Sequence, residues 1–122
     1  MPGHPEEREK EVKKRNDAKW PRAPGFKPSW KRFKAKNSQI SDAMTTFDRC
    51  KRAVPPEPLP GKMEDHKLDG PLKGYMDCHL DHDVVLIYKP LPNGAIKLLR
   101  VCDHSHLKGP KAKVLARLLK LE

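Results

Sequence analysis

The sequence is poor in the features that mark secreted and membrane proteins. Its 122 residues include only three cysteines, Cys50, Cys78 and Cys102, and none belongs to a Cys-x-x-Cys pair. Such an odd set disfavours a disulfide framework, and we expect three buried thiols in a reducing compartment. No run approaches the ~20 apolar residues that span a bilayer, and the N-terminus lacks the apolar core of a signal peptide. The sequence therefore predicts a soluble, cytoplasmic protein with no membrane partner.

Apolar residues are scarce in the chain and basic residues are abundant. Hydrophobic residues make up 36% of it and the mean hydropathy is -0.84, which indicates one small domain with polar extensions. The formal net charge is +10, and residues 1–36 hold twelve Lys and Arg against five Asp and Glu. A surface of this sign attracts polyanions, most often nucleic acid. A solvated tail or a contact with an acidic partner would also fit this composition.

The N-terminal half predicts a polar extension followed by two helices. Residues 1–25 are rich in proline and charge and lack apolar periodicity, so we expect a basic, mobile extension. A short helix should follow Pro28, and a second helix should begin after Ser38 or Ser41, which are both suitable N-caps. Four prolines in residues 54–61 then exclude helix and central strand alike and predict an extended connector.

From residue 62 the sequence pattern changes to period two, which is typical of β-strands. Strands are predicted over residues 72–80, 84–89 and 95–104, with hairpin turns at residues 81–83 and 92–94. Helices followed by an antiparallel meander predict an α+β fold, with the main domain over residues 26–109. Residues 110–122 predict a further amphipathic helix, which can pack on its own sheet or meet a partner.

Histidines are concentrated in the predicted sheet, where five of the six lie between His66 and His106. Cleavage of an RNA strand needs a base for the 2′-hydroxyl proton, an acid for the leaving 5′ oxygen and a cation for the charge on phosphorus. His, Asp and Arg can supply all three without a metal or another cofactor. If the third strand continues through His104, period two places Arg100 and His104 on one face, where both can approach one phosphate.

Several short motifs of this region occur together and in order. They are EDHKL (64–68), LKGY (72–75), DCH (77–79), Asp83, LIYK (86–89) and LRVCDHS (99–105). With these motifs the chain resembles the YafQ branch of the RelE/ParE toxin superfamily over about residues 62–109, and more loosely over the two preceding helices. The resemblance implies two N-terminal helices packed on a small antiparallel β-sheet, to which this chain adds its C-terminal helix.

The resemblance also implies a function, that of a bacterial type II toxin that cleaves mRNA on the ribosome and is held inactive by a cognate antitoxin. His66, His79, Asp83 and His104 match the acid and base positions of the family, and Arg100 matches its phosphate-stabilising arginine. We expect His104 to be the general acid, while Asp83, His66 and His79 are all candidates for the base. The expected products are a 2′,3′-cyclic phosphate, or its hydrolysed form, and a 5′-hydroxyl.

Two other interpretations stay open at the level of sequence. Val84 and Lys108 stand where the family commonly has aromatic residues, so the chain could instead bind nucleic acid or antitoxin without cutting RNA, or act on gyrase. The histidines favour the nuclease, because only cleavage needs acid and base groups. Cys78 and Cys102, each with neighbouring histidines, could also contribute to a zinc site, although their spacing fits no common zinc motif.

Overall fold

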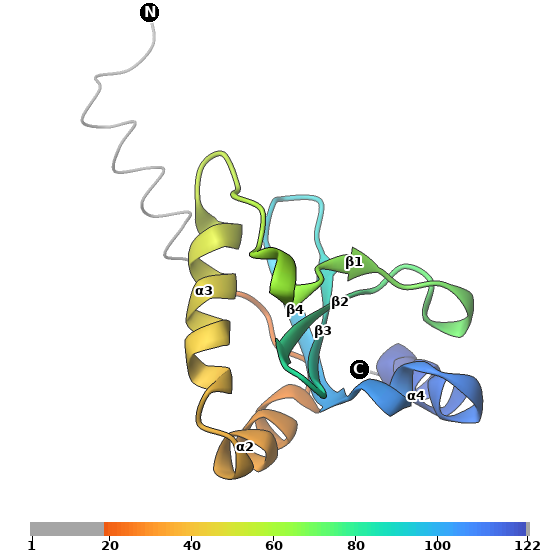
Figure 1. The fold of residues 1–122 in the computed structure, drawn as a ribbon. Helices are drawn as coiled ribbons and strands as arrows, with labels where there is room; N and C mark the ends of the chain where they lie inside the picture. Colours follow the sequence, from red (N-terminus) through yellow and green to blue (C-terminus); the bar gives the residue numbers. More distant parts are fainter. Residues whose placement is uncertain (1–18, 122) are drawn as a thin grey trace, which may run out of the picture.

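The structure, a computed structural model, describes residues 19–121 (Figure 1). Most of the predicted N-terminal extension, residues 1–18, lies outside the described residues. The elements are helices α2 (Phe26–Lys36) and α3 (Ile40–Arg52), strands β1 (His66–Lys67), β2 (Met76–Asp81), β3 (Val84–Pro90) and β4 (Ile96–Asp103), and helix α4 (Gly109–Leu121). Three short 3₁₀ turns complete the description: η1 (Gly61–Met63), η2 (Gly70–Leu72) and η3 (His104–Leu107). The predicted α+β fold is confirmed, with β1 as an additional strand.

The four strands form one antiparallel sheet in the order β1-β2-β3-β4, and the sheet carries an apolar core on each face. Leu86 and Tyr88 of β3 point toward α2 and α3, whereas Val85 and Ile87 point toward α4. Figure 1 shows this layering, with α2 and α3 on one side of the strands and α4 on the other. Because both faces of β3 are covered, its sequence is a continuous apolar run rather than an alternating one.

The packed domain begins earlier than the boundary at residue 26 that the sequence analysis predicts. Trp20 and Ala23 are buried in the two cores. The backbone N–H of Ala23 donates to the carbonyl of Leu98 (2.8 Å), and the N–H of Leu98 donates to the carbonyl of Pro21 (3.0 Å). This segment therefore covers the outer edge of β4, which would otherwise expose unpaired backbone groups. An irregular segment of this kind has no periodicity that a sequence pattern could reveal.

The start of α3 differs from the expected serine cap. The residue that precedes the helix is Gln39, and its side chain makes no capping hydrogen bond. Instead, the backbone N–H of Gln39 donates to Oδ1 of Asn37 (3.0 Å). Ser38 lies before the cap position and Ser41 lies inside the helix, so the predicted N-caps are wrong. The predicted end of this helix before Pro55 is confirmed, because α3 stops at Arg52.

The last strand departs from the alternation that the sequence predicts. Ile87 pairs with Arg100 but Tyr88 pairs with Leu98, so a bulge interrupts the β3–β4 register. β4 then ends at Asp103, and His104 is the first residue of η3. The expectation that a continuous strand aligns Arg100 with His104 is therefore wrong. The bulge lies before Arg100, and pairing is continuous from Arg100 to Asp103, so it is the 3₁₀ turn, with its different period, that ends the alternation before His104.

Helix α4 packs on its own sheet through only part of its apolar stripe. Leu115 and Leu119 are buried in the second core, whereas Val114 and Leu118 are 57% and 41% exposed. The helix also touches η2 and η3, so it supports the turn that carries His104. Among residues 19–121, no helix is long and apolar enough to cross a membrane.

The difference between the buried and the exposed apolar residues of α4 leads to a stability prediction. Leu115→Ala should lower the free energy of unfolding by about 2–5 kcal/mol, because it leaves a cavity in the second core. Val114→Ala is the matched control and should change stability by less than about 0.5 kcal/mol, because its side chain already meets solvent. Urea denaturation followed by circular dichroism measures both, and equal effects would contradict the packing of α4.

Candidate active site

Three histidines from separate segments gather around one buried carboxylate, that of Asp77. Asp77 and His79 lie on β2 with their side chains on the α4 face of the sheet, since their partners on β3 are Ile87 and Val85 of the second core. His66 of β1 is the cross-strand partner of Asp77. The ring of His104, at the start of η3, lies 5.3 Å from that of His79, measured between centroids. The tertiary structure therefore brings together three of the five predicted site residues.

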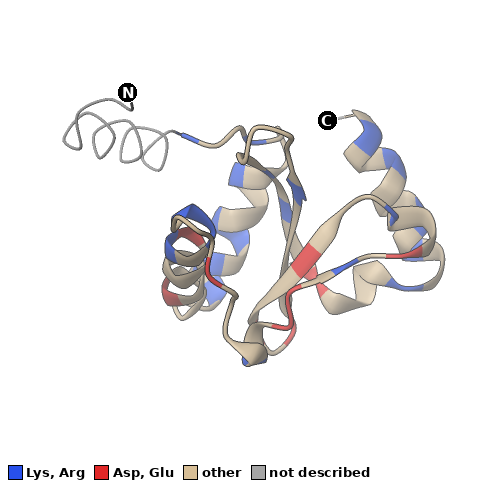
Figure 2. Ribbon diagram, turned by 90° about the horizontal axis from the view of Figure 1, so that it is seen from above, with Lys and Arg blue, Asp and Glu red and all other residues tan. Residues whose placement is uncertain are grey.

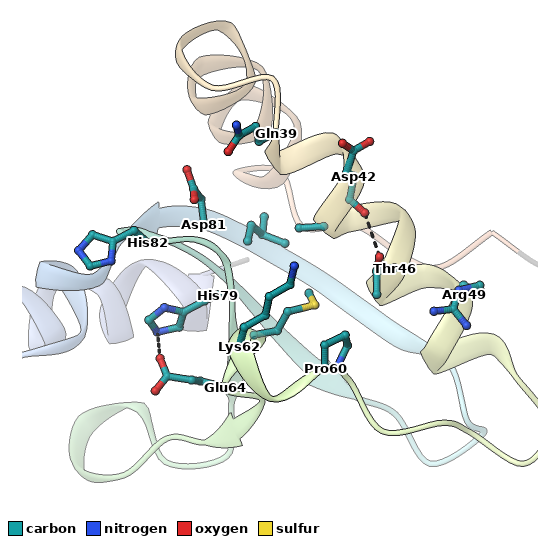
Figure 3. Close-up of a pocket in the computed structure, with 13 residues that line it drawn as sticks. Gln39, Asp42, Thr46, Arg49, Pro60, Lys62, Glu64, His79, Asp81 and His82 are labelled. Atoms are coloured by element: carbon teal, nitrogen blue, oxygen red, sulfur yellow. Dashed lines mark hydrogen bonds and ion pairs between the residues drawn. The ribbon is translucent and has the colours of Figure 1, made fainter.

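Glu64 orients two of these rings. Nδ1 of His66 lies 2.6 Å from the carbonyl oxygen of Glu64. Because a carbonyl only accepts, this N–H donates a hydrogen bond to it. The other nitrogen, Nε2, lies 3.0 Å from Oδ1 of Asp77. The side chain of Glu64 reaches His79 instead, with 3.3 Å between Oε2 and Nε2 (Figure 3). Both contacts limit how far the imidazole rings can rotate.

Asp77 is a residue of the candidate site that the sequence analysis did not select. It has no exposed surface, and among the described residues the His66 ring is its only ion-pair partner. Burial raises the pKa of Asp77, and this effect exceeds the opposing influence of the three nearby histidines; Asp65 raises the pKa further. The available sequence signal was its position two residues before His79, which places both side chains on one face of a strand.

The segment that carries Glu64 and His66 is anchored by the residue between them. Lys51 of α3 contacts Asp65 with 2.6 Å between Nζ and Oδ2, and the buried hydroxyl of Tyr88 donates a hydrogen bond to Oδ1. The Lys51 ammonium also lies 5.4 Å from the centroid of the Tyr88 ring. Glu64 itself has a φ of 45°, a left-handed conformation that costs about 1–2 kcal/mol for a non-glycine residue. The contacts of Asp65 hold this strained turn in place.

Arg100 and Asp83 border the histidine cluster. Arg100 pairs with Ile87, which in turn pairs with Asp77, so Arg100 and Asp77 stand two strand spacings, or about 10 Å, apart. Asp83 lies exposed in the β2–β3 turn. Its neighbour Val84 pairs with Asp103, the residue directly before His104. The structure thus keeps both predicted residues near the cluster, at its margin.

A polar cleft of about 780 Å³ opens between α3 and the outer edge of β2 (Figure 3). His79 and Glu64 lie on its border, and Lys62 and Arg49 contribute positive charge. β1 pairs with only Met76 and Asp77, so the rest of this edge of β2 is left without a strand partner. The cleft therefore gives solvent and solutes access to the ring of His79.

The cysteines do not form the zinc site considered above. All three are free and buried, as the sequence predicts. Burial raises the pKa of Cys102 to about 12 and raises that of Cys78 further, which disfavours the thiolate that binds a metal. Cys78 and His79 point to opposite faces of β2, because neighbouring strand residues alternate. Within residues 19–121, no group of His, Cys, Asp and Glu is arranged to hold an ion.

The fold is one that bacterial toxins share. The YoeB/ParE toxin from Agrobacterium tumefaciens superimposes with a TM-score of 0.57 over 71% of this chain and 99% of that chain, at 12% sequence identity. YafQ from Escherichia coli strain BL21(DE3) gives a TM-score of 0.57 at 26% identity, over 73% of this chain and 96% of that one. YafQ in the E. coli DinJ-YafQ toxin-antitoxin complex gives 0.57 at 27% identity, over 73% and 94%.

The sequence matches define the family more narrowly. Residues 19–109 match the family described as "Bacterial toxin of type II toxin-antitoxin system, YafQ", so the chain belongs to the YafQ family. The mRNA interferase toxin YafQ of E. coli strain K12 is 42% identical over 52 residues, which are 43% of this chain and 55% of that protein. The putative toxin YafQ of Haemophilus influenzae is 56% identical over 32 residues, 26% and 31% of the two chains. The chain thus aligns with about half, or less, of the length of these relatives.

The buried carboxyl of Asp77 predicts a pH-dependent stability. Since burial raises its pKa, the protonated carboxyl stabilises the fold fully below the ordinary pKa of aspartate, and this stabilisation is lost as the pH rises through the raised value. Asp77→Asn has no such loss, so its stability relative to the wild type should rise as the pH increases above about 4, the ordinary pKa of aspartate. Urea denaturation at a series of pH values from about 4 upward measures this difference in stability, and the exposed Asp69→Asn is the control. A difference that stays constant with pH would contradict the assignment.

The anchor at Asp65 predicts a separable effect on the histidines. Tyr88→Phe keeps the buried ring but removes the hydroxyl, and should lower the free energy of unfolding by about 1 kcal/mol. Because the Asp65 side chain then keeps only its contact with Lys51, the ring signals of His66 and His79 should also shift in nuclear magnetic resonance spectra. Tyr75→Phe, a half-buried tyrosine, is the control. Unchanged ring signals in Tyr88→Phe would show that the anchor only stabilises the fold.

Proposed function

We propose that this protein is the toxin of a type II toxin-antitoxin system and acts as an endoribonuclease that cleaves mRNA on the ribosome. The observation that carries the proposal is the pair of imidazoles 5.3 Å apart, His79 and His104, beside the buried carboxyl of Asp77. Two such rings can contact one phosphodiester from two sides, which is the arrangement that acid and base catalysis of RNA cleavage needs. The E. coli relative bears the name mRNA interferase toxin.

The proposed reaction is a transfer of the phosphoryl group within the RNA. His79 takes the proton of the 2′-hydroxyl, and the 2′ oxygen attacks phosphorus. The bond to the 5′ oxygen breaks, and His104 gives that oxygen a proton, so the products are a 2′,3′-cyclic phosphate and a 5′-hydroxyl. Glu64, 3.3 Å from His79, orients the ring and stabilises the imidazolium that forms. No step requires a metal or a cofactor.

The remaining site residues have supporting roles in this scheme. Arg100 contributes a fixed positive charge on the same face of the sheet, where it can stabilise the charge that develops on the phosphate oxygens. His66 lies 3.0 Å from the buried Asp77 carboxyl, between Nε2 and Oδ1, and helps to position that carboxyl beneath the two reacting rings. Asp83, in the β2–β3 turn, orients the ring of His104 or serves as the alternative base.

A toxin of this kind needs partners of two sorts. Crystal structures of the E. coli DinJ-YafQ complex show an antitoxin bound to a YafQ, and we infer a cognate antitoxin for the present chain. The mRNA target and the ribosome place its site of action in the cytoplasm. The net charge of +10 favours association with both mRNA and ribosomal RNA.

Inducible expression in a bacterial host tests this function. The wild-type chain should arrest growth and produce in-frame cuts when the 5′ ends of mRNA are mapped. His104→Ala and His79→Ala should each lower the cleavage rate by about 10²–10⁴-fold, because each removes a proton-transfer group. Asp69→Asn, an exposed change with no cap hydrogen bond to lose, is the control and should arrest growth like the wild type.

The outcomes separate the nuclease from its alternatives. Growth arrest without mRNA cleavage would replace the nuclease with a gyrase-directed or purely binding toxin. Cleavage that persists unchanged in His104→Ala would reject the catalytic assignment even if the nuclease itself is correct. Circular dichroism of each purified variant shows that a lost activity is not a lost fold.

A further inference from the structure

A second groove lies between α2 and α4, where β4 ends, and has a volume of about 680 Å³. Its floor is apolar and includes Phe33, Val101 and the exposed Val114 and Leu118. Its rim is basic, with Arg32 and Lys36 on α2 and Lys111 on α4. The groove therefore combines apolar side chains with basic side chains from both helices, and Asp103 is the one acidic residue of the lining.

The two helices that form the groove carry charge of one sign only. α2 has five basic residues and α4 has four, all exposed, and neither helix contains an acidic residue. Figure 2 shows the basic residues as successive bands along α4, while the acidic residues lie elsewhere in the structure. Arg32, Lys36 and Lys111 form no ion pair with any residue of the described range 19–121. Their charge is consequently available to a ligand with repeated negative groups.

The groove leads directly from the proposed catalytic centre. Arg100, the proposed phosphate-binding residue, is part of its lining, and so is Asp103, the residue directly before His104. α4 forms one wall of the groove and begins at Gly109, the last residue of the family match. One side of the groove is thus built by an element beyond the part of the chain that the family describes.

We propose that the α2–α4 groove binds the single-stranded RNA substrate next to the phosphate that is cleaved. The rim cations contact successive phosphates, and a base and its sugar lie on the apolar floor, the combination by which proteins hold single strands without reading their sequence. The inference rests on the proposed function, since it names the path of the substrate through the same site. A protein helix with acidic flanks would fit similar chemistry, but the continuity with Arg100 favours the RNA strand.

Two matched triple variants test the groove. The first, Arg32→Ala with Lys36→Ala and Lys111→Ala, removes three rim charges, and the second, Lys27→Ala with Lys34→Ala and Lys113→Ala, removes three charges from the same helices outside the groove. Both are made in the His104→Ala background so that RNA is not consumed. Binding of a labelled RNA of about 12 nucleotides is followed by fluorescence anisotropy at several salt concentrations.

The first triple variant should bind at least about tenfold more weakly and lower the slope of log affinity against log salt by about 2, as the loss of three phosphate contacts requires. The second should change affinity by less than about threefold, because its charges act only at a distance. Equal losses in the two variants would show diffuse attraction and overturn the groove. No loss in either variant would overturn it as well.

A change in the groove floor tests the apolar part of the proposal. Val114→Asp puts a negative charge at a position that is 57% exposed, so the fold should tolerate it. In the otherwise wild-type protein, KM for cleavage of ribosome-bound mRNA should rise with kcat nearly unchanged, because binding and not chemistry is affected. Ala35→Asp introduces the same charge on α2 outside the groove and should leave KM near the wild-type value. Equal KM in the two variants would overturn the proposed floor.

These experiments can reject the proposed groove and the proposed nuclease independently of each other. If the wild-type chain binds RNA through the groove but never cuts it, the nuclease is wrong and the groove stands. If the chain cleaves RNA while both the rim triple and Val114→Asp behave as the wild type, the nuclease stands and the groove is wrong. In the latter case an acidic protein segment becomes the better candidate for the groove.

Discussion

The burial of β3 on both of its faces is the constraint on which the rest of the structure depends. Its side chains alternate between a core shared with α2 and α3 and a core shared with α4. Each fully buried aliphatic side chain stabilises the fold by about 1.5–3 kcal/mol, so the register of β2 and β4 against β3 is strongly determined. Once that register is set, Asp77 and His79 of β2 must face the α4 side, next to apolar neighbours that exclude water from Asp77.

The candidate site depends on a short segment that is not regular secondary structure for most of its length. Glu64 contacts His79 and His66 contacts Asp77, whereas the Asp65 side chain between them points back to Lys51 and Tyr88. A carboxyl without exposed surface at Asp77 is costly for folding, and a left-handed Glu64 adds strain. Costs of this kind are common where a protein holds reactive groups in place for chemistry, and the well-packed cores offset them.

Much of the fold was predictable because its signals are local. The three longer strands, both N-terminal helices and the C-terminal helix follow from apolar periodicity and from the positions of proline and glycine. The packed segment at the start of the described residues, with Trp20 and Ala23, was not predictable, since its contacts with the edge of β4 have no sequence period. The two-residue strand β1 was missed for the same reason, and the bulge opposite Ile87 broke an alternation that the sequence alone would extend.

The sequence by itself determined the class of fold and the family, because these depend on residue types at fixed spacings along the chain. It supplied three histidines of the cluster but did not say which would meet. The tertiary structure decided that the rings of His79 and His104 lie 5.3 Å apart, that Asp77 is buried beside His66, and that α4 forms a groove with α2. These outcomes depend on strand register, on a bulge and on contacts between distant segments, and such properties arise only when the chain packs.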